Sequence, residues 1–156
     1  MSGRVNIHAT CVAIGGKGVL LLGPSGAGKS DLALRLIGRG AKLVADDRCE
    51  LVVVRGVLTA SAPKTIAGLL EVRGVGLVEY PYSPRAAIAL AVDLSAAIER
   101  LPGPRDFVPP AALKLRQSAR PPLIALNAFE ASAADKIVAA LRHVARRRRR
   151  AAVKGI

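Results

Sequence analysis

The sequence is poor in aromatic residues and cysteines, and it contains no tryptophan. Aromatic side chains make up 3% of the 156 residues although 51% of the residues are hydrophobic, so the core has to be built from Val, Leu, Ile and Ala. The two cysteines, Cys11 and Cys49, have neither the spacing of a metal site nor that of a redox pair. We therefore expect two reduced thiols in the core of a cytoplasmic protein.

A long apolar run is also missing. No stretch reaches the about 18 residues that a membrane helix needs, and no charged segment followed by an apolar one opens the chain as a signal peptide would. The composition therefore predicts a soluble intracellular protein with no membrane partner.

Acidic residues are few: 11 stand against 24 basic ones, which gives a net charge of +13. Six basic residues lie in the segment 146–156, and subtracting them from +13 leaves +7 for the rest of the chain. We predict one domain over residues 1–145 and a basic, disordered tail over 146–156. A basic surface favours an acidic protein, a nucleotide or a nucleic acid as partner, but the scarcity of aromatic side chains argues against nucleic acid.

Hydrophobic periodicity and turn residues predict an α/β fold with more strand than helix. A proline-rich stretch from 102 to 122 shows no clear period, and Leu69–Val78 mixes strand residues with two glycines. We expect the first helix to bridge two neighbouring strands. The predicted strands are Val5–Ile14, Val19–Leu22, Leu43–Ala45, Glu50–Val54, Val57–Ala60 and Ala87–Leu94, and the predicted helices are Ser30–Arg39 and Ser132–Arg147.

The octapeptide GPSGAGKS separates the second strand from the first helix and fits the pattern G-x-x-x-x-G-K-[ST]. Its glycines let the backbone wrap around an anion with its N–H groups pointing inward, and the helix adds its N-terminal dipole. In this pattern Lys29 contacts the β- and γ-phosphates and the Ser30 hydroxyl ligates Mg²⁺. A chance glycine loop is the alternative. The predicted nucleotide-binding residues are Gly23, Pro24, Ser25, Gly26, Ala27, Gly28, Lys29 and Ser30.

Two adjacent carboxylates, Asp46 and Asp47, follow the next buried strand. Open α/β sheets bind ligands at this edge, and adjacent side chains on an extended chain point to opposite sides. One carboxylate can therefore approach a metal ion while the other faces an incoming hydroxyl, and phosphoryl transfer needs both roles. A plain acidic turn is the alternative. The absence of an N-K-x-D string argues against a GTPase.

Three segments together resemble the catalytic, C-terminal domain of HPr kinase/phosphorylase in its short alphaproteobacterial-type form. They are His8–Thr10, GPSGAGKSDLALRLIGRGAKLVADDRCEL and LLEVRGVGLVEY, and the resemblance covers residues 5 to 94 well. It implies a P-loop-containing, strand-rich fold that resembles phosphoenolpyruvate carboxykinase. Longer members have an N-terminal domain and form hexamers. We expect no such domain here, because the chain begins almost at the catalytic domain, and we expect a homo-oligomer by resemblance.

The resemblance implies an ATP- and Mg²⁺-dependent protein-serine kinase that phosphorylates HPr, a small phosphocarrier of the sugar phosphotransferase system. The family also runs a phosphorylase reaction, which is linked to an R-P-G-R loop in longer members. Nothing in this sequence matches that loop, so we expect the kinase reaction first. Two other functions fit the same residues: a catalytically weak, nucleotide-sensing regulatory protein and a small-molecule kinase.

Site roles follow from the resemblance, motif by motif. Asp46 matches the aspartate that acts as the base in phosphorylation, and Asp47 is its metal-side neighbour. His8 could otherwise be a strand histidine with its hydrogen bonds satisfied, and Arg73 could form a salt bridge with Asp47 or Glu71. The expected catalytic residues are Lys29, Asp46, His8 and Arg100, and the expected metal ligands are Ser30, Asp47 and Glu71.

Overall fold

The long strand β1 (Val5–Ile14) organises the fold in the computed structural model of the chain, which describes residues 3–154 and the side chains through residue 147. Within these residues the helices are α1 (Lys29–Ile37) and α2 (Ala133–Lys154). The other strands are β2 (Lys17–Leu22), β3 (Lys42–Ala45), β4 (Arg48–Val54), β5 (Val57–Ser61), β6 (Leu69–Val72), β7 (Gly76–Glu79), β8 (Ala86–Asp93) and β9 (Leu123–Ala125). The six predicted strands and both predicted helices are therefore present. Strand β1 has the predicted ends, and the other elements have shifted ends.

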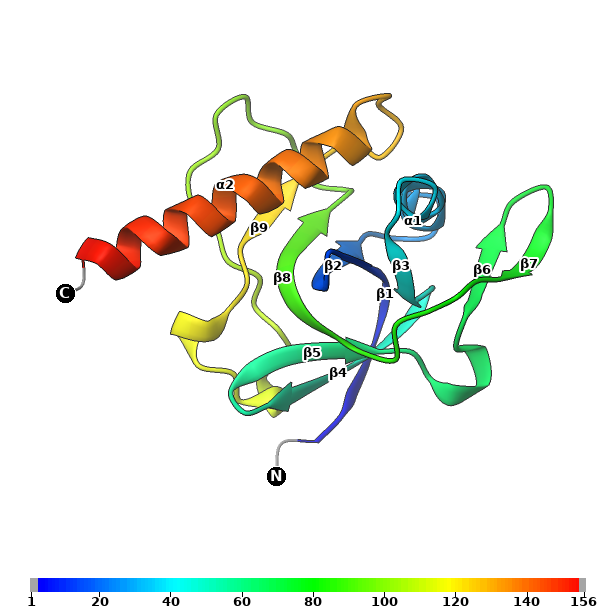
Figure 1. The fold of residues 1–156 in the computed structure, drawn as a ribbon, viewed down its shortest axis with the longest axis horizontal. Coiled ribbons are helices and arrows are strands. Elements are labelled where there is room, and N and C mark those ends of the chain that lie inside the picture. The colour runs from blue at the N-terminus through cyan, green and yellow to red at the C-terminus, as the bar shows by residue number, and fades with distance from the viewer. Residues whose placement is uncertain (1–2, 155–156) are drawn as a thin grey trace.

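The strand pairings form a closed circuit. The first half of β1 pairs with β4, while its second half pairs with β2 on one edge and with β3 on the other. Strand β8 pairs with β5 at its beginning and runs parallel to both β2 and β9 further along. Because β4 also pairs with β5, the circuit runs β1–β2–β8–β5–β4 and back to β1 (Figure 1).

Helix α1 connects β2 to β3, which we expected to be neighbours. That expectation is wrong, because β1 lies between them and pairs antiparallel with both. The turn at Gly15 and Gly16, where φ is 56° and 82°, folds β2 back against β1 as a hairpin. The chain then crosses over β1 through α1, which contacts β1, and β3 pairs with the other edge of β1.

Both faces of the sheet are buried, as alternation along the strands requires. On one face Val12, Val19 and Leu21 pack against Leu32 and Leu36 of α1 and against α2. On the other face Cys11 and Leu20 pack against β3, β4 and β5. Both helices thus lie on the same side of the sheet, where they contact each other.

The two cysteines lie in the second core, buried and unpaired. Burial raises the pKa of the Cys49 thiol to about 12 and raises the pKa of Cys11 well above its ordinary value. Both therefore act as small apolar side chains, which confirms the prediction of core thiols.

The C-terminal third differs most from the prediction. Strand β9 was missed because the prolines before it hide any period. Helix α2 continues past Arg146, where we expected the tail to begin, and alanine and arginine are strong helix formers. Residues 155 and 156 and the side chains from 148 on lie outside the described part, so the disorder of the tail stays a prediction. Within residues 3–154 the structure has no helix with the length and hydrophobicity to cross a membrane.

Helix α2 offers a matched pair of substitutions for its packing. The side chain of Ile137 is fully buried against the sheet, whereas the neighbouring Val138 is 47% exposed. We expect Ile137→Ala to lower the free energy of unfolding by about 2–5 kcal/mol, because it leaves a cavity in the core. Val138→Ala should change it by about 0.5 kcal/mol or less. Urea denaturation measures both, and equal effects would contradict the described packing of α2.

Candidate active site

The loop at residues 23–30 follows β2 and wraps around the N-terminus of α1. Gly26 and Gly28 have φ angles of 88° and 94°, which side chains with a Cβ rarely adopt. A Cβ on Gly28 would lie 2.7 Å from the Cβ of Ala128, so this glycine also lets a second chain segment approach closely. The positive φ angles are consistent with a phosphate-binding loop, in which successive backbone N–H groups surround an anion.

Lys29 begins α1 and is 6% exposed. Its ammonium group donates hydrogen bonds to the carbonyl oxygens of Gly23, at 2.6 Å, and Pro24, at 3.0 Å. Burial lowers its pKa, and the carboxylates of Asp47 and Asp46 act against that shift. Of its three donors, one is left to contact a phosphate. The loop therefore holds its own cation in place.

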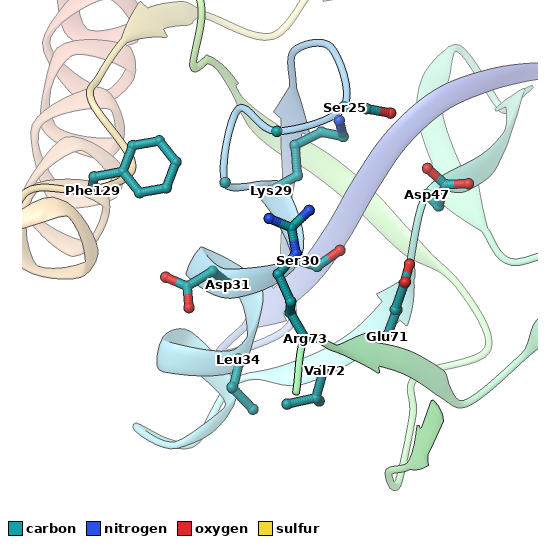
Figure 2. A pocket seen from close by; sticks show the side chains of 12 residues that line it. Ser25, Lys29, Ser30, Asp31, Leu34, Asp47, Glu71, Val72, Arg73 and Phe129 are labelled. Atoms are coloured by element: carbon teal, nitrogen blue, oxygen red, sulfur yellow. The ribbon is translucent and has the colours of Figure 1, made fainter. Parts of the chain in front are cut away.

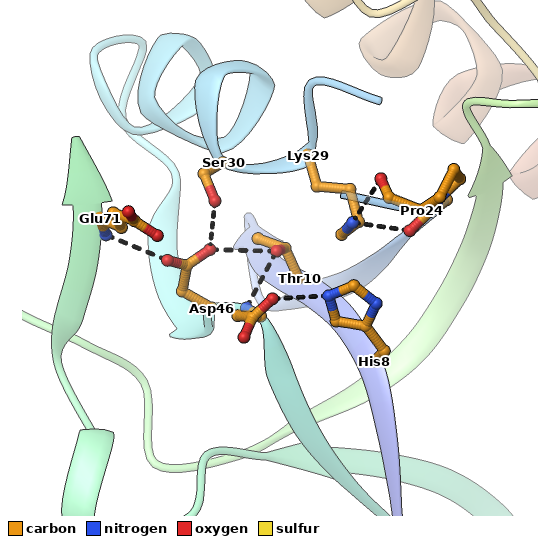
Figure 3. A network of polar contacts seen from close by, with 9 residues as sticks. His8, Thr10, Pro24, Lys29, Ser30, Asp46 and Glu71 are labelled. Carbon is orange, nitrogen blue, oxygen red and sulfur yellow. Dashed lines mark hydrogen bonds and ion pairs between the residues drawn. The ribbon is translucent and has the colours of Figure 1, made fainter. Parts of the chain in front are cut away.

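Asp46 is the centre of the polar network in Figure 3. Its Oδ1 accepts hydrogen bonds from the hydroxyls of Ser30, at 2.6 Å, and Thr10, at 3.1 Å. Its Oδ2 accepts the backbone N–H of Glu71 at 3.0 Å. The residue is 7% exposed, so this carboxylate joins α1, β1 and β6 inside the protein.

Asp47 points the other way. Its φ of 66° lies in the left-handed region, which turns the chain between β3 and β4. Its carboxylate is 2.6 Å from Nε2 of His8, and its side chain is 61% exposed. The two carboxylates therefore diverge as predicted, but Asp46 reaches Ser30, where we expected Asp47. The reason is the left-handed turn, which carries Asp47 toward β1.

The hairpin of β6 and β7 brings Glu71 to the site. Figure 1 shows this two-stranded unit projecting from the main sheet, with its own turn at Gly74. Together with the loop it encloses a pocket of about 370 Å³ (Figure 2). The pocket is lined by Ser25, Gly26, Gly28, Lys29, Ser30, Asp31, Leu34, Asp47, Glu71, Val72, Arg73 and Phe129.

The oxygen ligands at the pocket suit Mg²⁺. Ser30 supplies a hydroxyl, and Asp47 and Glu71 supply carboxylates on the pocket wall. Within the described residues no cluster of three or more His, Cys, Asp or Glu forms a cage for a metal ion. This pattern fits Mg²⁺, which is usually held by one or two protein groups together with substrate phosphates.

Other predicted residues lie further out. Asp46 bonds Ser30 and His8 contacts Asp47, but neither Asp46 nor His8 lines the pocket. Arg100 is exposed on the segment after β8. Arg73 lines the pocket, yet no ion pair joins it to Asp47 or Glu71 in the described part of the chain. The salt bridge that we considered for Arg73 is therefore not formed among the described residues.

The prediction overlooked three contributors. Thr10 is fully buried and bonds Asp46, and the two-residue period from His8 could have placed it on the same face of β1. Arg35 donates to the carbonyl oxygens of Ala128 and Glu130, so it fastens a distant segment to α1. Phe129 on that segment lines the pocket, and no local signal in the sequence places it there.

Sequence relatives match half of the chain. HPr kinase/phosphorylase from Clostridium acetobutylicum is 45% identical over 78 residues, which are 50% of this chain and 26% of that protein. The same protein from Clostridium tetani is 44% identical over 78 residues, again 50% of this chain and 26% of the relative. The matched region thus spans about a quarter of the length of these curated relatives.

A solved structure matches nearly the whole chain. It is the HPr(Ser) kinase/phosphatase from Coxiella burnetii, which superimposes with a TM-score of 0.74 and covers 97% of this chain and 96% of that one at 21% identity. This likeness shows the fold, which is the α/β, strand-rich fold predicted from the sequence. The family model of the HPr serine kinase C-terminal domain matches residues 1–83, more than half of the chain. The chain therefore belongs to the HPr serine kinase C-terminal domain family.

Proposed function

We propose that this protein is an ATP- and Mg²⁺-dependent kinase that phosphorylates a serine of an HPr-type phosphocarrier in the cytoplasm. The observation that carries the proposal is the Asp46 carboxylate, which bonds Ser30 of the phosphate loop, Thr10 of β1 and the backbone of Glu71. Two of these partners, Ser30 and Glu71, line the pocket, so the carboxylate joins segments that are far apart in the sequence directly behind it. Relatives that match half of the chain are named HPr kinase/phosphorylase.

Each side chain of the site has a role in phosphoryl transfer under this proposal. The loop and Lys29 bind the phosphates and stabilise the charge that develops on the transferred group. Ser30 and Glu71, together with Asp47 on the pocket wall, would hold Mg²⁺, which when bound would neutralise phosphate charge. By the family resemblance Asp46, which lies behind Ser30 and is not itself on the pocket wall, accepts the proton of the attacking serine hydroxyl. Asp47 lies on the pocket wall, where its bond to His8 fixes its direction.

Charge on the protein surface supports an acidic protein substrate. The net charge is +13, and a basic surface raises the association rate with an acidic partner. The hexamer expected from the resemblance stays a prediction, as does a catalytic role for Arg100.

Transfer to the carrier tests the proposed function directly. The protein would be incubated with Mg²⁺, ATP labelled at the γ-phosphate and an HPr-type carrier. We expect label on one serine of the carrier and none after that serine is changed to alanine. ATP binding without transfer would favour the nucleotide-sensing regulatory protein. Label on metabolites alone would favour the small-molecule kinase.

Replacement of Lys29 tests the phosphate loop. We expect Lys29→Ala to lower the transfer rate by roughly 10²–10³, because it removes a buried cation aimed at the phosphates. Lys42→Ala is the matched control, since Lys42 is an exposed lysine at the start of β3. Single-turnover kinetics measure both variants. A Lys29→Ala protein that transfers phosphate at the parent rate would contradict the role of the loop.

The two aspartates can be separated by isosteric substitutions. Asp46→Asn should lower the single-turnover rate by roughly 10²–10⁴, the contribution of a positioned acid–base group. Asp47→Asn should have a smaller effect, because Asp47 bonds His8 and not Ser30. ATP affinity measured at several Mg²⁺ concentrations shows whether either variant acts through the metal. A larger loss in Asp47→Asn than in Asp46→Asn would overturn the assignment.

A further inference from the structure

The pocket has one aromatic side chain among the residues that line it, and this ring is exposed. Phe129 is 68% exposed, although it lies on a wall of the pocket. Phe107 and Tyr80, in contrast, pack against the two hydrophobic cores. A ring that stabilises no core and faces a binding pocket has a free apolar face for a ligand.

The position of this ring is fixed by its neighbours. The N–H of Phe129 donates to the side-chain oxygen of Asn127 at 3.0 Å, which forms a tight turn. Arg35 of α1 donates hydrogen bonds to the backbone carbonyl oxygens of the residues before and after Phe129, which are Ala128 and Glu130. Ring atoms lie 3.2 and 3.3 Å from where a Cβ on Gly28 would be, so the ring sits beside the phosphate loop. The backbone that carries the Phe129 ring is therefore fixed by these hydrogen bonds before a ligand binds.

The pocket has two chemically different ends. Figure 2 shows Asp47 and Glu71 on one side, Phe129 on the opposite side, and the loop with Lys29 and Ser30 between them. Acid–base and metal chemistry belongs at the terminal phosphate of a nucleoside triphosphate, and the nucleoside is attached at the other end of the phosphate chain. A triphosphate on the loop with its terminal phosphate near the carboxylates thus directs its nucleoside toward Phe129.

Resting on the proposed function, we propose that Phe129 forms a nucleoside subsite in which its ring stacks on the nucleobase of ATP. Arg35 is a positioning residue for this subsite, because it holds the turn that carries the ring. Stacking on an aromatic ring is tolerant of base identity, since every base has a π-face. The subsite therefore contributes affinity for the nucleoside and leaves the phosphates to the loop.

Calorimetric binding of two ligands in the presence of Mg²⁺ tests the subsite. ATP has both phosphates and nucleoside, whereas inorganic tripolyphosphate has the phosphates alone. We expect Phe129→Ala to weaken ATP binding by about 5- to 150-fold, the range for loss of one base–aromatic stack. Tripolyphosphate affinity should stay within about twofold. Phe129→Tyr should keep the parent affinity for ATP, because tyrosine preserves the aromatic face. Phe129→Leu should lose most of the ATP affinity that the ring contributes, because leucine has no aromatic face.

Controls separate the subsite from the proposed function. Leu101→Ala removes another exposed apolar side chain, 89% exposed and outside the pocket, and should leave both affinities unchanged. A parent protein that binds neither ligand would overturn the proposed function and the subsite with it. Parent binding of both ligands, with ATP affinity unaffected by Phe129→Ala, would overturn the subsite alone. A loss of tripolyphosphate affinity in Phe129→Ala as large as its loss of ATP affinity would also overturn the subsite. An unchanged ATP affinity with a raised KM for the carrier would do the same.

Discussion

The hydrogen bonds to the Asp46 carboxylate are the interaction on which the rest of the site depends. A buried carboxylate is costly unless its oxygens are hydrogen-bonded, and here three donors from three elements meet that requirement. The two carboxylate oxygens of Asp46 accept hydrogen bonds from different elements. Oδ1 accepts the hydroxyls of Thr10 and Ser30, while Oδ2 accepts the backbone of the β6–β7 hairpin. The position of the hairpin is thereby coupled to the phosphate loop through one side chain.

The sequence was most informative where chemistry forces local structure. The loop between β2 and α1 was predictable because its glycines, lysine and serine follow a fixed spacing between a strand and a helix. The strands were predictable because two buried faces leave continuous apolar runs. The roles within the Asp46–Asp47 pair were less accessible. They depend on a positive φ at Asp47, and aspartate adopts that conformation in only a minority of its occurrences. Sequence reasoning on an extended strand predicted that the side chains diverge, but not which one meets Ser30.

Phe129 could not be placed from the sequence for a different reason. Its contact with the loop joins residues about 100 positions apart, and it exists because Arg35 binds carbonyl oxygens, which carry no side-chain signal. The segment also lies outside residues 1–83, which the family model matches. The pocket wall with Lys29, Ser30, Asp47 and Glu71 is thus built from the residues that the family model matches. The opposite wall comes from the rest of the chain.

The closed circuit of strand pairings also bears on self-association through strand edges. Strands that lack a partner on one edge offer free backbone N–H and C=O groups to another chain, and long, flat edges promote aggregation. Here the long strands β1 and β8, of ten and eight residues, each pair with three other strands, although residues 5–8 of β1 pair with β4 alone. In the described part of the chain the strands left at an edge are β3, β6, β7 and β9, each three or four residues long. A chain in which half of the residues are hydrophobic therefore offers neighbouring copies only short lengths of unpaired backbone.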